Sequence, residues 1–263
     1  MTLIRYQPRT DSRAGQRTEQ ECRQAIIQVC HLMHQKGFVS ATDGNVSVRL
    51  DEDRFLVTPS GFSKGLLRPD HLLVIDWEGN VVGLHKYGPA RHLRPTSEVL
   101  LHLEAYRRRP DIRAVVHAHP PIAIALSIAG ISLARCLLPE VVLSLGLIPT
   151  TEYATPSSAE GARVISGLIE RYDALVLKRH GSVTVGADVI EAYLKLEKVE
   201  HTALITKTLI ELGREEPFPE EQVQKLIARR AEKGSMRPGQ AEDFCAACGV
   251  CDVAGIPRKN QHI

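Results

Sequence analysis

The chain has 263 residues, of which 43% are hydrophobic and 24% are charged, and its formal net charge is +2. This length is enough for one large domain or two small ones with a sizeable core. A net charge so close to zero gives no support for nucleic acid or a membrane surface as a partner. The longest apolar run, residues 122–134, is too short to span a bilayer.

The start of the chain has no apolar stretch of the length that a signal peptide needs, so a cytoplasmic protein is expected. The six cysteines are then expected to be reduced thiols or metal ligands. The sequence contains neither a G-x-G-x-x-G motif nor a P-loop motif. Nucleotide binding therefore has no support from the sequence.

Residues 1–17 are polar and are expected to form a flexible leader. Thr18 and Glu21 have the spacing of a capping box, which predicts a helix that begins there and ends at Gly37. Three short strand-like segments follow, at residues 45–50, 54–60 and 72–83.

A helix is predicted over residues 96–109, with Thr96 or Ser97 as its N-cap. The apolar run 114–119 then predicts a strand. Further helices and strands are predicted at residues 122–129, 157–172, 174–186 and 187–212. Ser157 and Glu160 have the spacing of a second capping box.

Some neighbouring strands are joined by tight turns and others by helices. This pattern favours an α/β protein built as an α/β/α sandwich, in which helices cover a central mixed, mostly antiparallel sheet. We expect one domain over residues 18–215. Residues 216–263 are expected to form a C-terminal extension, which is charged at first and ends in a cysteine cluster.

Two histidines, His117 and His119, interrupt the strand 114–119. Side chains two residues apart in a strand point to the same face, so this pair can bind one zinc ion. The alternative is a pair of polar residues where the strand leaves the core. His180, which follows an apolar strand and precedes a glycine, is the best candidate for a third ligand, although it is equally typical of a turn. His102 and His201 are expected to be solvated on helical faces.

Glu98 is placed to act as the acid/base that a catalytic zinc site usually needs. It lies at the predicted start of the helix over residues 96–109, where backbone amides favour anions such as phosphate. The alternative is a glutamate that only stabilises the helix dipole.

Six short motifs together resemble one family, the class II aldolase/adducin family, and in particular its fuculose-phosphate aldolase branch. The matching segments are GNVSVR (44–49), TPSG (58–61), PTSE (95–98), HAH (117–119), YAT (153–155) and RHG (179–181). Their order and approximate spacing fit the family over residues 20–212.

The resemblance implies roles for particular residues. His117, His119 and His180 would hold Zn²⁺, with Mn²⁺ or another divalent metal as the alternative. Glu98 would occupy a metal position in the resting site and then act as acid/base. The substrate phosphate would be bound by the residues Asn45, Ser60, Gly61, Thr96 and Ser97.

The resemblance also implies a reaction and an assembly. The family cleaves a ketose 1-phosphate to dihydroxyacetone phosphate and an aldehyde, so a sugar phosphate is the expected small-molecule partner. A metal ion would stabilise the negative charge of the enediolate that forms when the carbon–carbon bond breaks. Family members are typically homotetramers with active sites between subunits.

Two features depart from the family pattern. Leu138 stands where the fuculose-phosphate enzyme has a tyrosine, and Glu140 is the candidate to take over its acid/base work. The alternative is that Glu140 forms a surface or inter-subunit salt bridge. Dehydration or decarboxylation of a related substrate therefore stays open, as does a non-catalytic association domain.

The cysteine cluster at the end of the chain is the second departure. Cys245, Cys248 and Cys251 have a spacing that suits zinc or an iron–sulfur cluster. The alternative is a tail whose thiols have no ligand.

Overall fold

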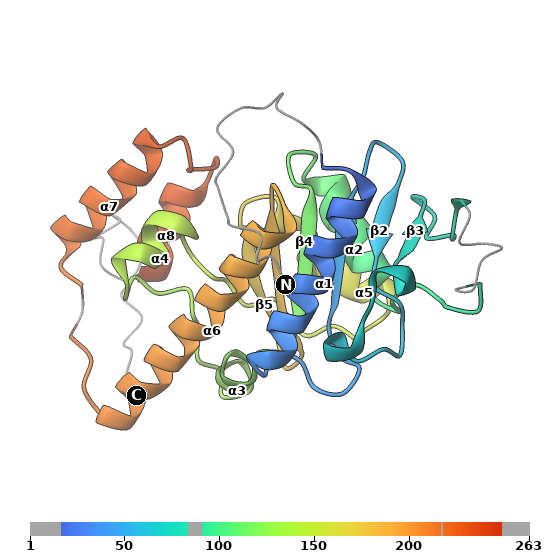
Figure 1. Ribbon diagram of the computed structural model, residues 1–263. Coiled ribbons are helices and arrows are strands. Elements are labelled where there is room, and N and C mark those ends of the chain that lie inside the picture. The colour runs from blue at the N-terminus through green and yellow to red at the C-terminus, as the bar shows by residue number, and fades with distance from the viewer. Residues whose placement is uncertain (1–16, 84–90, 217, 249–263) are drawn as a thin grey trace.

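The computed structural model describes residues 17–83, 91–216 and 218–248 (Figure 1). Most of the predicted leader and Cys251 lie outside the described residues, and the side chains of Cys245 and Cys248 are not described. The elements are α1 (Glu19–Gln35), β1 (Asn45–Arg49), β2 (Phe55–Val57), η1 (Lys64–Leu66), η2 (Pro69–His71), β3 (Leu73–Ile75), α2 (Val99–Arg108), β4 (Ala114–Ala118), α3 (Pro121–Ile128), α4 (Pro139–Ser144), α5 (Ala159–Ile169), β5 (Ala174–Leu177), β6 (Gly181–Gly186), α6 (Val189–Leu212), α7 (Glu220–Glu232) and α8 (Gln240–Cys248).

The six strands form one sheet in the order β3-β2-β1-β4-β6-β5. Every neighbouring pair is antiparallel. Of the three isolated bridges among the described residues, two are antiparallel and one, between Thr150 and Val176, is parallel. The predicted mostly antiparallel sheet is therefore confirmed.

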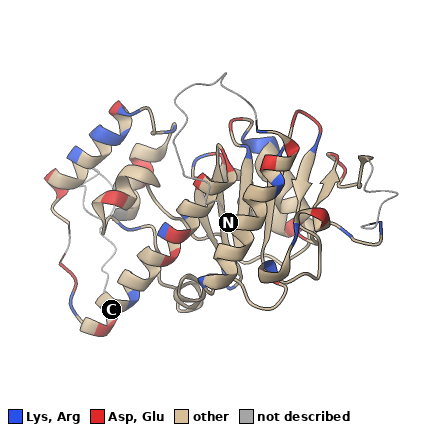
Figure 2. Cartoon of the chain, viewed as in Figure 1, with Lys and Arg blue, Asp and Glu red and all other residues tan. Residues whose placement is uncertain are grey.

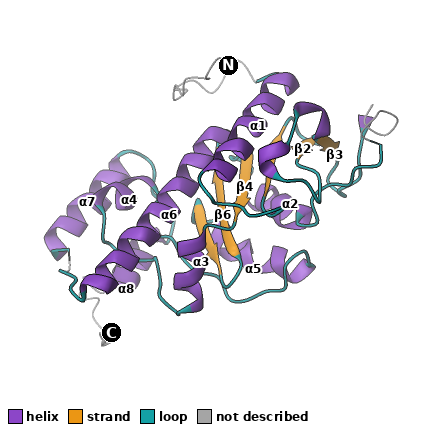
Figure 3. Cartoon of the chain, turned by 60° about the horizontal axis from the view of Figure 1, so that its bottom comes forward, coloured by secondary structure: helices purple, strands orange, loops and turns teal. Residues whose placement is uncertain are grey.

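Helices cover both faces of this sheet (Figures 1 and 3). Val116 and Ala118 of β4 face a core cluster that includes residues of α1 and α6. Val115, one residue away, faces a second cluster that includes residues of α2 and α5. This alternation along one strand divides the core into two layers, and the predicted α/β/α sandwich is confirmed.

The first helix has the predicted capping box. The Thr18 hydroxyl accepts a hydrogen bond from the Glu21 amide at 3.2 Å, and the Glu21 carboxylate accepts one from the Thr18 amide at 2.7 Å. Gly37 follows the helix with a φ of 70°, a left-handed conformation that favours glycine.

The second helix begins later than the sequence predicts. Its N-cap is Glu98, and no side-chain hydrogen bond caps it, so the expectation of Thr96 or Ser97 as N-cap is wrong. The Thr96 hydroxyl instead accepts a hydrogen bond from the Glu98 amide at 3.3 Å. Residues 95–98 bend before the helix because Thr96 is tied to the end of β2 through a backbone hydrogen bond to Thr58.

The expected capping box at Ser157 is also displaced. Ser158 is the N-cap of α5 and accepts from the Gly161 amide. The Glu160 carboxylate accepts from the Thr155 amide, outside the helix. Ser157 has a φ of 57° and donates its hydroxyl proton to Ser97, which removes it from the helix start.

The C-terminal helices α7 and α8 lie beside α4 at one end of the sandwich (Figure 1). The buried Arg230 guanidinium donates to the carbonyl oxygens of Leu143 and Leu145, at 2.9 and 3.4 Å. Asp243 of α8 accepts from Arg171 at 2.6 Å. The boundary between a domain at 18–215 and an extension at 216–263 remains a prediction.

Positive and negative side chains are interspersed over the helices, in keeping with the net charge of +2 (Figure 2). Among the residues that the structure describes, none of the helices combines the length and the apolar character needed to cross a bilayer. Cys22 and Cys30 are free and buried. Cys136 is disulfide-bonded, so the expectation of reduced thiols or metal ligands is wrong for this residue.

Replacement of Gly181 by alanine should destabilise the sheet. A Cβ at this position would lie 2.3 Å from the Ala118 carbonyl oxygen, so strand β6 would have to shift away from β4. Overpacking of this kind typically costs about 1–3 kcal/mol of the free energy of unfolding. Urea unfolding measures the change.

The matched control is Gly167→Ala in α5. A Cβ there meets no atom within 4 Å, so the substitution should be neutral or should stabilise the helix by up to about 1 kcal/mol. Equal stability of the two variants would contradict the proposed packing at Gly181.

Candidate metal centre and active site

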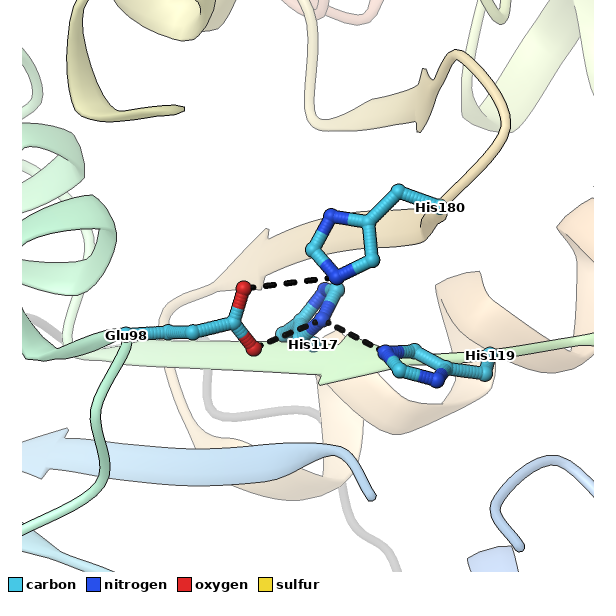
Figure 4. A group of neighbouring side chains, drawn as sticks. All are labelled: Glu98, His117, His119 and His180. Atoms are coloured by element: carbon cyan, nitrogen blue, oxygen red, sulfur yellow. Dashed lines mark hydrogen bonds and ion pairs between the residues drawn. The ribbon is translucent and has the colours of Figure 1, made fainter. Parts of the chain in front are cut away.

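Four side chains converge at one edge of the sheet (Figure 4). Glu98 comes from the N-cap of α2, His117 from β4, His119 from the residue after β4, and His180 from the turn between β5 and β6. Each offers one ligand atom, and these atoms lie within 4.8 Å of one another. The structure therefore brings together all four residues that were expected to bind a metal.

The hydrogen-bond partners of the histidines indicate which ring nitrogens face the centre. His117 donates from Nδ1 to the Ser182 carbonyl oxygen at 2.9 Å, which turns Nε2 toward the centre. That Nε2 lies 3.0 Å from Glu98 Oε2 and 3.1 Å from His119 Nε2. His119 Nδ1 lies 3.4 Å from the Asp43 carboxylate, which favours a proton on Nδ1.

Nitrogen and oxygen atoms that can each offer a lone pair thus face one another across the centre. Glu98 Oε1 also lies 3.4 Å from His180 Nε2. Such an arrangement needs a positive charge between the groups, either protons or a metal ion. Three imidazole nitrogens and one carboxylate oxygen form a donor set that fits Zn²⁺ and other divalent first-row metals.

The electrostatic environment keeps the ligands in the forms that bind metal. Burial raises the pKa of Glu98, but the adjacent His117 and the hydrogen bond from Asn45 outweigh it and hold the pKa below its usual range. Burial, reinforced by His117, lowers the pKa of His119 and that of His180 to about 4. At neutral pH the carboxylate is ionised and these two rings are neutral.

Close backbone packing positions the ligands. The site for a Cβ at Gly181 also lies 3.0 Å from atoms of the His117 and His119 rings. Gly44 has a φ of 71°, and a Cβ there would approach the His117 carbonyl oxygen to 3.0 Å. The glycines of the GNVSVR and RHG motifs therefore allow the strands to meet beside the ligands.

His102 is not solvated, contrary to the sequence-based expectation, and its side chain is buried. Its Nε2 lies 2.5 Å from Asn45 Oδ1, and its Nδ1 lies 2.6 Å from Ser47 Oγ. Asn45 in turn donates from Nδ2 to Glu98 Oε2 at 2.9 Å. The prediction was wrong because it considered His102 alone, whereas the ring faces β1 and bonds to its side chains. His201 is exposed, as expected.

The residues expected to bind phosphate lie on adjoining segments. Backbone hydrogen bonds join Ser60 to Arg94 and Thr96 to Thr58, so the TPSG and PTSE segments run side by side. Ser60, Gly61 and Ser97 are exposed, whereas Asn45 and Thr96 are buried. Both polar ends of the Asn45 side chain are already bonded within the chain.

A pocket of about 380 Å³, including its open mouth, adjoins the four-residue cluster. Glu98 and His180 form part of its wall, together with Ser97 and the ion pair of Lys178 and Glu152. The pocket gives a small polar molecule direct access to the cluster. Its lining residues are Ser97, Glu98, Leu100, Leu101, Thr151, Glu152, Ala154, Pro156, Ser157, Ser158, Gly161, Val164, Leu177, Lys178 and His180.

Glu140 lies apart from this cluster within the part of the chain that the structure describes. It is exposed in the first turn of α4, and the group of potential metal ligands does not include it. Asp43, Ser47 and Tyr106 contact the site residues but were not singled out from the sequence. The sequence signal that could have identified Tyr106 is its four-residue spacing from His102 and Glu98, which places the three on one face of a helix.

Comparison with known proteins places this geometry in a family. A model of the Class II Aldolase and Adducin N-terminal domain matches residues 24–206. The chain belongs to this family.

Individual relatives carry two different activities in their names. An L-fuculose phosphate aldolase from Methanococcus maripaludis is 33% identical over 188 residues, which is 72% of this chain and 97% of that protein. A 3-oxo-tetronate 4-phosphate decarboxylase from Haemophilus influenzae is 32% identical over 191 residues, covering 71% of this chain and 87% of that protein. The family of enzymes to which the chain is similar thus includes both aldolases and decarboxylases.

Solved structures give the same picture. The structure of YgbL from Klebsiella pneumoniae, whose title names aldolase, epimerase and decarboxylase together, has a TM-score of 0.69 and 30% identity, covering 80% of this chain and 99% of that one. An L-fuculose 1-phosphate aldolase has a TM-score of 0.70 and 26% identity, covering 79% and 95%.

The purified protein should contain about one divalent metal ion per chain. His117→Ala should lose most of this metal because it removes the ligand nearest both Glu98 and His119. Inductively coupled plasma mass spectrometry measures the content. His201→Ala, on the exposed face of α6, is the control and should retain the metal. A His117→Ala protein with an unchanged metal content would refute the assignment.

The metal-free protein should lose stability as the pH falls below 6.5. Burial lowers the pKa of His102 to about 3, and those of His119 and His180 to about 4. Between these values and 6.5 the unfolded chain binds more protons than the folded one, so the free energy of unfolding rises with pH. Each histidine contributes up to about 1.4 kcal/mol per pH unit.

Urea unfolding in the presence of a chelator, between pH 7.5 and 5, tests this dependence. His201→Gln removes an exposed histidine and should leave the slope unchanged. A stability that does not change between pH 6.5 and 5 is the contrary result.

Proposed function

We propose that this protein is a divalent-metal-dependent lyase that cleaves a ketose 1-phosphate to dihydroxyacetone phosphate and an aldehyde. The observation that carries the proposal is the convergence of Glu98, His117, His119 and His180 beside an open pocket. The substrate would resemble fuculose 1-phosphate or a deoxy-pentulose 1-phosphate. Zinc is the proposed metal, with manganese as the alternative.

When bound, the metal would supply a Lewis acid that stabilises negative charge on the carbonyl half of the substrate. His117, His119 and His180 would hold it, with Glu98 as a fourth ligand in the resting state. The hydrogen bond between His117 Nδ1 and the Ser182 carbonyl supports this role, because it fixes the ring with Nε2 facing inward.

Glu98 is the proposed acid/base. In aldol cleavage the bond between C3 and C4 breaks, the C4 hydroxyl loses a proton, and C3 gains one. The Glu98 carboxylate is buried, is ionised at neutral pH and lies in the pocket wall, so it can carry a proton to or from C3. It must first leave its contact with His117.

Five residues are proposed to bind the substrate phosphate: Asn45, Ser60, Gly61, Thr96 and Ser97. The exposed hydroxyls of Ser60 and Ser97 lie on two paired segments just before α2, where the helix dipole also favours an anion. Asn45 would become available when Glu98 moves, because its Nδ2 would then lose its present acceptor.

The acid/base for the aldehyde half is proposed to be Glu140. Its exposure on α4, apart from the cluster of its own chain, is in keeping with service at the site of a neighbouring subunit. We also propose a homotetramer with active sites between subunits, which is what the resemblance to the family implies.

Decarboxylation is the second candidate function. It is favoured by the similarity to a 3-oxo-tetronate 4-phosphate decarboxylase and by Leu138 in place of the tyrosine of the fuculose-phosphate enzyme. Loss of CO₂ from a 3-oxo acid also breaks a carbon–carbon bond beside a carbonyl, but no hydroxyl proton has to be removed. Glu140 would then have no acid/base work.

A substrate panel tests the two candidates on metal-loaded enzyme. Aldol cleavage should release dihydroxyacetone phosphate from a ketose 1-phosphate, whereas the second candidate should release CO₂ from a 3-oxo acid 4-phosphate. For either reaction Glu98→Gln should lower kcat by about 10²–10⁴-fold, the usual contribution of a positioned acid/base. Glu211→Gln, an exposed change at the end of α6, is the control.

Glu140→Gln separates the candidates further. It should reduce aldol cleavage by a similar factor and leave decarboxylation unchanged. Release of CO₂ without any triose phosphate from the panel would replace the aldolase proposal by the decarboxylase one. The absence of both products would exclude both activities for these substrate classes.

A further inference from the structure

We infer that His102 is a positioning residue, which fixes the Asn45 amide and through it the orientation of the Glu98 carboxylate. The inference rests on the proposed function, because it concerns how Glu98 is held at the metal centre. His102 itself does not face the cluster: it lies one turn further along α2, buried between this helix and β1.

Polar residues of two elements meet on this buried surface. Glu98 is the N-cap of α2, and His102 and Tyr106 follow within the helix at intervals of four residues. The three side chains therefore lie on one face of the helix. Asn45 and Ser47 are two residues apart and share one face of β1. The two faces are joined by four hydrogen bonds in an otherwise apolar layer.

The four hydrogen bonds form a series that leads from Tyr106, near the C-terminal end of α2, to Glu98 at the metal centre. Tyr106 OH lies 2.8 Å from Ser47 Oγ, and Ser47 Oγ lies 2.6 Å from His102 Nδ1. His102 Nε2 lies 2.5 Å from Asn45 Oδ1. Asn45 Nδ2 then lies 2.9 Å from Glu98 Oε2.

The chemistry of the groups dictates the direction of the bonds at the centre. An ionised carboxylate can only accept, so Asn45 must turn its NH₂ group to Glu98. Its carbonyl oxygen then faces His102 and can also only accept, so the proton of the neutral ring must be on Nε2. The remaining ring nitrogen, Nδ1, accepts from the Ser47 hydroxyl.

The direction of the bonds matters because Asn45 can be flipped with almost no change in shape. In the flipped state its carbonyl oxygen would face the Glu98 carboxylate, two acceptors in contact. His102 prevents this state because its Nε2–H needs the carbonyl oxygen as an acceptor. Asn45 is also the direct cross-strand partner of His117, so the same amide lies beside both Glu98 and a metal ligand.

Two amide substitutions separate this positioning role from simple packing. A glutamine at 102 has its terminal nitrogen three bonds from Cβ, as Nε2 of histidine is, so it can still donate to Asn45. An asparagine has its polar atoms two bonds from Cβ, as Nδ1 is, so it can reach Ser47 but not Asn45. His102→Gln should therefore preserve the site, and His102→Asn should not.

Zinc affinity is the first readout, measured by competition with a fluorescent chelator on the full chain freed of metal. His102→Asn should bind zinc about 10–100-fold more weakly than the unmodified protein, the usual effect of losing an outer-shell partner. His102→Gln should bind nearly as tightly as the unmodified protein. Tyr106→Phe, which breaks only the far end of the chain of bonds, should also retain its affinity.

Turnover is the second readout, on whichever substrate the panel identifies. His102→Asn should lower kcat because Glu98 is misdirected, and it should also raise KM because Asn45 is one of the proposed phosphate-binding residues. Circular dichroism and thermal unfolding establish that each variant is folded. If His102→Asn does not fold, His102→Gln compared with His102→Leu decides the question in the same way.

The outcomes distinguish the two proposals. Equal zinc affinities for His102→Gln and His102→Asn, in folded proteins, overturn the positioning role and leave the proposed function intact. An unmodified protein that binds no divalent metal overturns both. Weak binding in His102→Asn together with tight binding in His102→Gln supports the positioning role even where the substrate is a 3-oxo acid.

Discussion

The register between β1 and β4 is the constraint on which the rest of the site depends. It sets Asn45 directly opposite His117, with both side chains on the face of the sheet that α2 covers. A shift of one strand by one residue would turn one of these two side chains into the opposite layer, among the residues packed on α1 and α6. Such a shift is costly because it would bury the polar side chain of Asn45 or His117 among apolar residues without its hydrogen-bond partners.

Burial then gives this polar surface its stiffness. Asn45, His102 and Glu98 are each at most 8% exposed, so their hydrogen bonds have little competition from water. The carboxylate is the last member of the series, and it alone borders the pocket. Buried residues therefore hold the Glu98 carboxylate from one side, and on the side of the pocket the carboxylate can exchange partners.

Much of the fold was predictable because the sequence is locally consistent with it. The capping box at Thr18, the strand ending in the two histidines and the long helix α6 all follow from short-range patterns. The starts of α2 and α5 were misplaced, since Thr96 and Ser157 hydrogen-bond to residues far away along the chain. Long-range partners of this kind leave no periodic trace in a sequence.

The same distinction applies to the site. The three histidines and Glu98 were candidates from their positions in predicted strands and at a helix start, and the resemblance to a family joined them into one site. The structure brings them together. His102 was misjudged because its partners, Asn45 and Ser47, precede it by more than fifty residues. A histidine on a helix has no local mark that separates a solvated position from a buried one. The placement of Glu140 relative to a neighbouring subunit lies beyond what one chain contains.

The spread of the ligands along the chain has a consequence for biosynthesis. Glu98 and His180 belong to segments on either side of β4, and His180 is oriented only once β5 and β6 have paired. A nascent chain that has emerged from the ribosome only as far as β4 lacks the third imidazole. An ion held by all four groups would therefore favour the completed fold over every shorter intermediate, and cation supply during synthesis would influence how much finished protein accumulates.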